Sequence, residues 1–261
     1  MARITTSFGE LDYDLHGEGQ PAMLFIHGWT SDRHAFKPQV AHFSKSHLCI
    51  TSDQLGHGKS DAPEMDYTPH SQAEVMAELL DGLGITDVIV VGHSMGGLIA
   101  VELAAMRPDQ VKAVIMVDPA QFFVSEKAAT AMSHNLDRMK KGQVNEVMGE
   151  IAKGVLFLVS DPLDTKLYAA KTSQATPLHV TTSAWDAMIT YDGADALSKI
   201  NCPIINIPAH NPQNRVEALQ AFAPHMEEEQ TTGVGHFNQL DAAERVTDIM
   251  DDFLGRHGLA G

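Results

Sequence analysis

The segment Gly92-His93-Ser94-Met95-Gly96 holds a serine at the centre of a G-x-S-x-G pattern. It follows an apolar run at residues 88–91 and precedes a stretch with helical spacing of apolar residues from Leu98 onward. This succession of strand, tight turn and helix is typical of a nucleophile elbow, in which a sharp turn lifts the serine Oγ above the edge of a sheet. Glycine suits both flanking positions, because a Cβ there would strike a neighbouring strand or helix. We therefore predict that Ser94 is a catalytic nucleophile.

A serine hydroxyl is a poor nucleophile at neutral pH, so it needs a nearby base, which in turn needs an orienting carboxylate. His236 is the strongest candidate for the base, because it stands in a glycine-bounded loop just before an amphipathic helix predicted over residues 242–254. His225 lies in a polar, acidic stretch and His257 follows that last helix, so neither matches this position. We predict that His236 accepts the proton of Ser94.

Two carboxylates and one amide compete for the role of the orienting group. Asp118 directly follows the strand predicted over residues 111–117. The loop after the strand predicted over residues 203–207 contains Asn211 but no carboxylate before Glu217. Glu217 falls inside a predicted helix. We favour Asp118 over Glu217 and over the neutral Asn211.

Strands and helices alternate along most of the chain. Short apolar runs predict buried strands at residues 23–26, 48–51, 88–91, 111–117 and 203–207. Apolar residues recur with helical spacing at residues 35–43, 71–84, 216–222 and 242–254. Two alternating stretches around Gly9 predict an opening hairpin over residues 3–16. This order predicts an α/β fold with a mainly parallel sheet flanked by helices.

Three candidate residues, His27, Ser94 and Asp118, each directly follow a predicted strand. The carboxyl ends of parallel strands lie at one edge of a sheet, and ligands bind at that edge in open α/β folds. We therefore expect the three side chains to gather there. His27 and the neighbour of the serine, His93, are expected to line the substrate pocket.

Residues 121–196 interrupt the alternation, because they are rich in Ala, Met, Lys and Gln, have helical periodicity and contain no convincing strand. We predict that they form a helical cap, or lid, over the strand ends, while residues 1–120 and 197–261 form the core domain. Phe122 and Trp185 of this cap are expected to contribute to the substrate pocket.

The composition is that of a globular protein with a strongly acidic balance. The chain has 261 residues, of which 44% are hydrophobic and 20% charged, and its formal net charge is −16. This charge disfavours binding to nucleic acid or to anionic membranes, so we expect a small-molecule substrate and a monomer or homodimer. Cys49 and Cys202 are expected to be reduced, and with no apolar signal segment in view we predict a cytoplasmic location. No histidine pair has the helical spacing of a metal site, so we expect no metal.

Four motifs together resemble the α/β-hydrolase fold superfamily: Phe25-Ile26-His27-Gly28-Trp29, residues 53–60, Gly92 to Gly97, and Gly235-His236-Phe237. The resemblance covers nearly the whole chain outside residues 121–196. It implies Ser94 as nucleophile, His236 as base, and an oxyanion hole formed by the backbone N–H groups of Trp29 and Met95. It also implies a structural role for residues 53–60. The chain departs from most members at the acid, which usually comes a few residues after the strand at 203–207.

Superfamily members with an acid at the position of Asp118 include esterases, dehalogenase relatives and cofactor-free dioxygenases that open quinolone rings. A haloalkane dehalogenase needs Asp in place of Ser94, so that activity is excluded. The well-formed elbow favours a serine hydrolase that cleaves carboxylic esters of small to medium apolar substrates through an acyl-enzyme, without a cofactor. The alternative is a cofactor-independent 2,4-dioxygenase that opens 3-hydroxy-4-quinolone rings. In that enzyme, His236 and Asp118 deprotonate the substrate, and Gly28-Trp29 and the placement of Asp118 favour this alternative.

Overall fold

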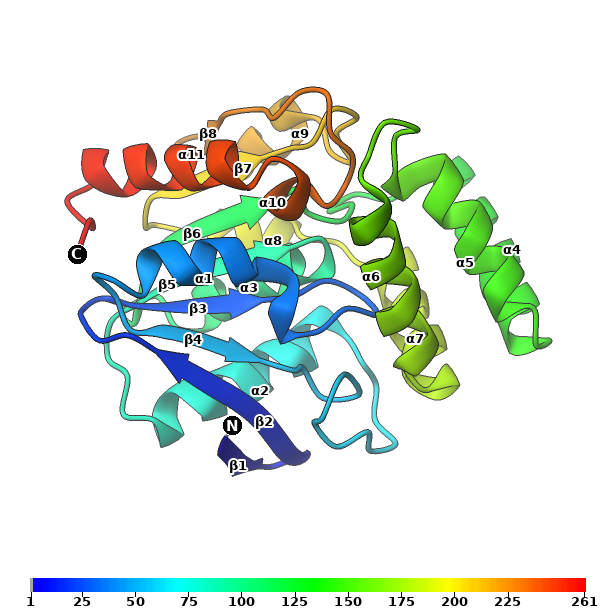
Figure 1. Cartoon of the computed structure of the whole chain (residues 1–261), viewed down its shortest axis with the longest axis horizontal. Helices are drawn as coiled ribbons and strands as arrows, with labels where there is room; N and C mark the ends of the chain where they lie inside the picture. Colours follow the sequence, from blue (N-terminus) through cyan, green and yellow to red (C-terminus); the bar gives the residue numbers. More distant parts are fainter. Residues whose placement is uncertain (1) are drawn as a thin grey trace.

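An eight-stranded, mostly parallel sheet with helices on both faces forms the body of the computed structural model, which describes residues 2–261 (Figure 1). The strands are β1 (Ala2–Thr6), β2 (Gly9–His16), β3 (Ala22–Ile26), β4 (Cys49–Ser52), β5 (Val88–His93), β6 (Val111–Val117), β7 (Ile204–Ile207) and β8 (Glu227–Glu228). Their order across the sheet is β1-β2-β4-β3-β5-β6-β7-β8. β2 pairs antiparallel with β1 and β4, and all further pairs are parallel.

The central strands are buried on both faces, which explains their continuous apolar sequences. Every residue of β3 and of β5 is buried, and Leu24 of β3 lies beside Val90 of β5 in the parallel register. Alternate side chains of each strand enter two separate hydrophobic clusters, one on each face of the sheet. The polar residues that follow these strands are thereby held at a rigid edge.

Helices cover both faces of the sheet (Figure 1). One face carries α1 (Lys37–Phe43), α10 (Asn238–Asp241) and α11 (Ala243–Arg256), and the other carries α2 (Pro69–Gly82), α3 (Met95–Met106) and α8 (Ala194–Ser198). The start of α2 shows how local sequence defines an element. Thr68 Oγ1 accepts the N–H of Ser71 at 3.0 Å, and Pro69 occupies the first turn, where its missing N–H costs nothing.

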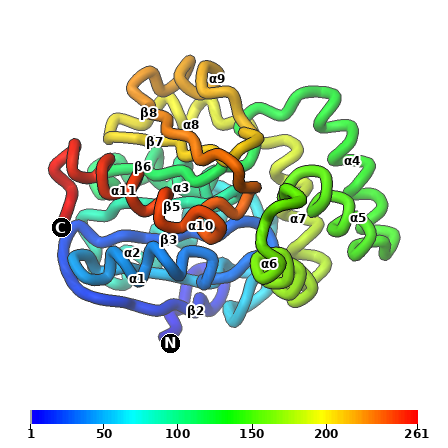
Figure 2. The backbone as a smooth tube through the Cα atoms, turned by 45° about the horizontal axis from the view of Figure 1, so that its top comes forward, coloured from blue at the N-terminus to red at the C-terminus, as the bar shows by residue number. Residues whose placement is uncertain are grey.

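Between β6 and β7, the chain leaves the sheet and forms a helical layer at the carboxyl ends of the strands (Figures 1 and 2). This layer contains α4 (Glu126–Lys140), α5 (Val144–Ile151), the π-helical turn η2 (Ala152–Leu156), α6 (Leu163–Ala175) and α7 (Leu178–Ile189). α4 packs against α7, and Trp185 Nε1 donates to the carbonyl of Met132 at 2.9 Å. These helices lie within residues 121–196; the division of the chain into a core and a cap stays a prediction.

The α/β fold predicted from the sequence is confirmed, and the predicted hairpin and five strands are all present. Three elements differ from expectation. The helix expected over residues 216–222 is the shorter α9 (Val216–Gln220), and the edge strand β8 was missed because Glu227-Glu228 has no apolar pattern. The helix expected at 35–43 begins as the 3-10 turn η1 (Arg33–Phe36). None of the helices in residues 2–261 is long and apolar enough to cross a membrane.

Candidate active site

Ser94 occupies a strained turn between β5 and α3. Its φ of 55° and ψ of −123° are unfavourable for a residue with a Cβ. The neighbouring backbone holds this conformation, since Ser94 N–H donates to Val117 O at 3.2 Å and Ser94 O accepts from Gly97 N–H at 2.9 Å. A Cβ at Gly92 would overlap the carbonyl oxygen of Gly96, and a Cβ at Gly96 would overlap that of Ile26. Gly92 and Gly96 therefore permit the turn, because without a Cβ their backbones can lie directly against neighbouring carbonyl groups.

His236 and Asp118 form a buried pair. His236 Nδ1–H donates to Asp118 Oδ2 at 2.6 Å, and their side chains are 6% and 1% exposed. Asp118 Oδ1 accepts the N–H of Ala209 at 3.0 Å, so both carboxylate oxygens are used. Because Nδ1 carries the proton, Nε2 is left as the acceptor, and His236 lines the cavities that Ser94 also lines. The pair is arranged as a base with an oriented, lone-pair-bearing nitrogen.

The other two candidates for the orienting group lie elsewhere. Glu217 is on α9 with a side chain that is 72% exposed, and it forms an ion pair with Arg215 at 3.7 Å. Asn211 is exposed in the loop after β7. The structure therefore brings Asp118, and neither Glu217 nor Asn211, to the imidazole of His236.

Two backbone N–H groups next to Ser94 are unused. The N–H of Trp29, in the loop after β3, and that of Met95, the first residue of α3, have no hydrogen-bond partner within residues 2–261. The two loops are in contact, because a Cβ at Gly28 would lie 2.9 Å from Ser94 Cβ. Free donors on both sides of a serine match the arrangement that stabilises a developing oxyanion.

The loop after β3 is held by its neighbours in a tight turn. Thr30 has a φ of 54°, which is unusual for a β-branched residue, and its N–H donates to His57 Nε2 at 3.2 Å. His57 Nδ1–H donates to Leu55 O at 3.2 Å. Burial lowers the pKa of His57 to about 3, so the ring stays neutral and its Nε2 remains an acceptor. His57 therefore fixes the turn that carries the free N–H of Trp29.

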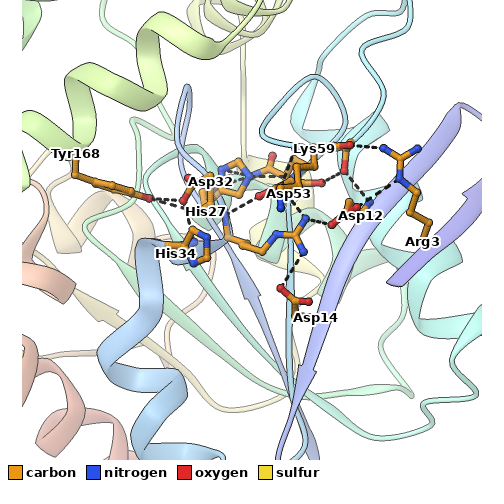
Figure 3. A network of polar contacts seen from close by, with 12 residues as sticks. Arg3, Asp12, Asp14, His27, Asp32, His34, Asp53, Lys59 and Tyr168 are labelled. Atoms are coloured by element: carbon orange, nitrogen blue, oxygen red, sulfur yellow. Dashed lines mark hydrogen bonds and ion pairs between the residues drawn. The ribbon is translucent and has the colours of Figure 1, made fainter. Parts of the chain in front are cut away.

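A buried ionic network lies under the same loop (Figure 3). Arg33 is 4% exposed and contacts Asp12, Asp14 at 3.0 Å and Asp53 at 2.7 Å. Asp53 also accepts the N–H of Arg33 at 2.9 Å and that of Lys59 at 2.8 Å. Burial acts to raise the pKa of Asp53, but the hydrogen bonds from Arg33, the charge of His27 and the N–H of Lys59 together keep this pKa below its ordinary value. These contacts of Asp53 agree with the structural role that the family resemblance implies for residues 53–60.

Two cavities meet at the serine. One, of about 200 Å³, lies against α5 and α6, and we name it the α5–α6 cavity; the other, of about 280 Å³, lies against α4 and α7 and is named the α4–α7 cavity. Four residues line both cavities: Trp29, Ser94, Leu156 and His236. Both cavities are lined mainly by apolar surface, and the α5–α6 cavity has the larger polar share, with Asn145, Lys166 and Gln174 among its lining residues. The α4–α7 cavity also has polar side chains, which are Gln121, Asn135 and Gln213. Ser94 and His236 are therefore on the boundary between a more apolar and a more polar space.

Two of the four residues expected in the substrate pocket line a cavity. His93 lines the α5–α6 cavity and Trp185 lines the α4–α7 cavity. Burial, followed by the charge of His236, keeps the pKa of His93 well below its ordinary value. The neutral ring donates from Nε2 to the carbonyl of His236 at 2.9 Å. His93 therefore holds the backbone of His236 as well as bordering the cavity.

His27 and Phe122 line neither cavity, which corrects the expectation from the sequence. His27 Nδ1–H donates to Gly28 O at 2.8 Å, and its Nε2 accepts the N–H of Gln54 at 3.0 Å, so both ring nitrogens are turned into the protein. Phe122 is fully buried beside Tyr191, with ring centroids 6.0 Å apart. Both side chains are structural because their polar or apolar contacts are satisfied away from the cavities.

Several residues near the site were missed by sequence reasoning. Tyr168 of α6 points toward Asp32 of the loop after β3 (Figure 3), and its hydroxyl lies 2.8 Å from Asp32 Oδ1 and 3.0 Å from Ser31 Oγ. Asp161 contacts the loop that carries His236. Helical periodicity predicts which residues of a cap are amphipathic, but it contains no signal for which core loop they contact. Within residues 2–261, no group of three or more His, Cys, Asp or Glu side chains is placed to hold a metal ion.

A family model described as alpha/beta hydrolase fold matches residues 21–148. The solved structure of a thermophilic esterase from Thermogutta terrifontis superposes with a TM-score of 0.86 over 98% of each chain, at 22% sequence identity. The family match covers β3 to α5 and the structural match covers the whole architecture. On these grounds, residues 21–148 are similar to the alpha/beta hydrolase family, and the chain as a whole has the α/β-hydrolase fold.

Two curated relatives are hydrolases. The 2-(acetamidomethylene)succinate hydrolase of Mesorhizobium japonicum is 37% identical over 126 residues, which are 48% of this chain but only 43% of that protein. The (E)-2-((N-methylformamido)methylene)succinate hydrolase of Acinetobacter baylyi is 26% identical over 254 residues, or 93% of each chain. The stronger identity is thus confined to less than half of the relative, and the full-length similarity is more distant.

Proposed function

We propose that this protein is a serine hydrolase that cleaves carboxylic esters of small to medium apolar substrates through an acyl-enzyme. The observation that carries the proposal is the meeting of Ser94, on its strained turn, and the His236–Asp118 pair at the boundary of two cavities. Hydrolase relatives that match part or most of the chain support the same reaction class.

In the acylation step, His236 Nε2 accepts the proton of the Ser94 hydroxyl while Oγ attacks the ester carbonyl carbon. The carbonyl oxygen becomes an oxyanion, which accepts hydrogen bonds from the N–H groups of Trp29 and Met95. The bond to the leaving oxygen then breaks, and His236 gives its proton to the departing alkoxide. Asp118 stabilises the imidazolium that forms between these two transfers.

Deacylation repeats the sequence with water. His236 removes a proton from a water molecule, whose oxygen attacks the acyl carbon on Ser94 Oγ. The second oxyanion accepts the same two N–H bonds, and its collapse returns the proton to Ser94 and releases the carboxylic acid. No step needs an electron acceptor, so the residues present account for the whole reaction.

The shapes of the two cavities support the substrate class. We assign the apolar part of the ester to the α4–α7 cavity, which is lined by Val124, Met132, Ile151, Trp185 and Met188 among others. The alcohol part then enters the α5–α6 cavity, where polar side chains alternate with apolar ones. A volume of about 280 Å³ suits a small to medium acyl group.

One observation favours a second candidate, the cofactor-independent opening of 3-hydroxy-4-quinolone rings. The Ser94 hydroxyl makes no hydrogen bond to His236 within residues 2–261, so Nε2 is open to a substrate proton. Catalytic hydrogen bonds are commonly loose in unliganded enzymes, however, and the two unused N–H donors have a role only if an oxyanion forms next to them. Ester hydrolysis therefore remains the proposal.

Hydrolysis of p-nitrophenyl butyrate by the wild type and by Ser94→Ala tests the proposal directly. We expect clear turnover by the wild type and a loss of several orders of magnitude in the variant, because the activated serine works as a unit with its base. Ser198→Ala, which removes an exposed hydroxyl on α8 away from both cavities, is the matched control. Turnover that is indifferent to Ser94 would refute the acyl-enzyme, and oxygen uptake with a 3-hydroxy-4-quinolone would then establish the second candidate.

A further inference from the structure

A short segment from the last residue of η2 to just before α6, residues 156–161, contacts the loop that carries His236. The N–H of His236 donates to Leu156 O at 2.8 Å, and the N–H of Gly235 donates to Asp161 Oδ1 at 3.1 Å. Two successive backbone donors of the histidine loop therefore end on oxygen atoms of a segment that lies outside the sheet and its flanking helices. The core supplies the third backbone contact, from His93 Nε2–H to His236 O at 2.9 Å.

Asp161 is built to hold this arrangement. It is 6% exposed, and its second oxygen, Oδ2, accepts the N–H of Leu158 at 2.8 Å. Each carboxylate oxygen thus receives one backbone N–H, one from its own segment and one from the histidine loop. Lys166 Nζ donates to the carbonyl of Asp161 at 2.7 Å and to that of Val159 at 3.1 Å, which fixes the turn from behind. The carboxylate is therefore a rigid bridge between two loops.

The two loops approach so closely that side chains are excluded at one position. A Cβ at Gly235 would overlap Asp161 Oδ2 and Leu156 O. One step further along, the rings of Phe157 and Phe237 stack with centroids 5.4 Å apart and planes inclined by 9°. The hydrogen bonds of Gly235 and His236 and the stacked rings of Phe157 and Phe237 together restrict the backbone of His236 to a single conformation.

We propose that residues 156–161 position the catalytic base, with Asp161 as a positioning residue for His236. The backbone N–H groups of Gly235 and His236 have their hydrogen-bond acceptors only when this segment is in place. The helical layer over the strand ends therefore helps to position the catalytic base as well as bounding the cavities. The proposal rests on the proposed function only in taking His236 as the base. A base held by both layers keeps Nδ1 aimed at Asp118 and Nε2 aimed at the cavities.

Three variants test this role in the full-length protein. Asp161→Ala removes both accepting oxygens, and Asp161→Asn keeps the volume but presents an NH₂ group to one of the two donors. Asp164→Asn is the matched control, because it removes the same charge from an exposed position on α6. Folding of each variant is verified by circular dichroism before the other measurements.

Two measurements report on the position of His236. The first is the downfield proton resonance of the His236 Nδ1–H in its hydrogen bond to Asp118, assigned by its loss in His236→Gln. The second is the rate at which a fluorophosphonate labels Ser94. We expect Asp161→Ala to broaden or remove the resonance and to slow labelling by about 10- to 100-fold, because a small displacement of a catalytic group costs that much. Asp161→Asn should lie between Asp161→Ala and the wild type, and Asp164→Asn should label within about twofold of wild type.

Two results would overturn the role of Asp161. One is a folded Asp161→Ala that labels at the wild-type rate and keeps the resonance; if Asp161→Ala does not fold, the same behaviour of Asp161→Asn has the same meaning. The other is an equal loss in Asp164→Asn, which would assign the effect to charge. A wild type that is not labelled at all contradicts the serine hydrolase, and the resonance then decides the positioning role alone.

Discussion

Asp118 and His236 stand 118 positions apart in the sequence, yet the Oδ2 of one lies 2.6 Å from the Nδ1 of the other. The aspartate is delivered by the end of β6 with a φ of 37°, and the loop after β7 donates a backbone N–H to its other oxygen. The end of the neighbouring strand β7 thus holds the Asp118 side chain in place. The loop after β7 contributes a backbone N–H to the carboxylate of Asp118, and it contributes no carboxylate of its own.

Asp118→Asn tests the acid assignment. An amide at this position can donate to His236 Nδ1 and so favour the wrong tautomer, and we expect ester turnover to fall on the order of 10³- to 10⁴-fold. Glu217→Gln, which alters an exposed side chain, should leave turnover within about twofold of wild type. Steady-state kinetics with p-nitrophenyl butyrate distinguishes the two; reversed severities would exclude Asp118 as the acid.

His57 makes stability depend on pH. Its pKa is about 3 in the folded protein, against an ordinary value of 6.5, so the unfolded chain binds more protons between these values. The stabilisation from neutral His57 is therefore fully present above pH 6.5 and is lost as the pH falls toward 3. We expect the free energy of unfolding to decrease by up to ~1.4 kcal/mol per pH unit from this group.

Urea unfolding at pH 7, 6 and 5 measures this slope. In His57→Gln, the titrating group is absent and an amide oxygen can still accept the N–H of Thr30. The variant should show a shallower decrease in unfolding free energy with falling pH than the wild type. His70→Gln is the control, because His70 is an exposed histidine. If that variant gave an equally shallow slope, the pH dependence could not be assigned to the burial of His57.

Tyr168→Phe tests the contact between α6 and the loop after β3. Burial raises the pKa of Tyr168, so its hydroxyl stays protonated and donates to Asp32 Oδ1 at 2.8 Å. Loss of that hydroxyl should lower the free energy of unfolding by about 1 kcal/mol. Tyr13→Phe is the control, because the Tyr13 hydroxyl has no hydrogen-bond partner within residues 2–261. Thermal unfolding curves that coincide for Tyr168→Phe and the wild type would contradict the contact.

Met188→Ala tests the assignment of the acyl group. Met188 lines the α4–α7 cavity and is 6% exposed, so its truncation enlarges that space. The ratio of kcat/KM for p-nitrophenyl octanoate over butyrate should rise by roughly threefold to tenfold, since each methylene contributes a modest discrimination. Leu178→Ala, on the same helix but 47% exposed, should leave the ratio unchanged. An unchanged ratio in Met188→Ala would place the acyl group in the other cavity.

The sequence predicted the parts of this molecule that depend on local pattern. Apolar runs located the central strands, and the flanking glycines of Ser94 located its turn, because both signals lie within a few residues. Asp118 could be favoured over Glu217 for a similar reason, since it directly follows a strand. The edge strand β8 has only two residues and no apolar pattern, so no local signal could reveal it.

Contacts between distant segments could not be predicted in this way. His27 follows a strand as Ser94 does, but the hydrogen bond from Gln54 turns its ring away from the cavities. Phe122 lies among the residues of the helical layer, but it is buried beside Tyr191. Asp161 is one acidic residue among many until the fold places it against Gly235. The sequence contains these residues, and only the tertiary structure assigns their partners.

The α4–α7 and α5–α6 cavities share four lining residues, and two of these, Ser94 and His236, are the nucleophile and the base of the proposed function. The remaining lining residues of each cavity belong to that cavity alone. Under the proposed function, substitutions on α4 and α7 would change the preference for the acid part of an ester and leave the preference for the alcohol part, and the reverse would hold for α5 and α6. Specificity for the two halves of a substrate would then be separable by mutation, so that proteins of this architecture could share one half of their specificity and differ in the other.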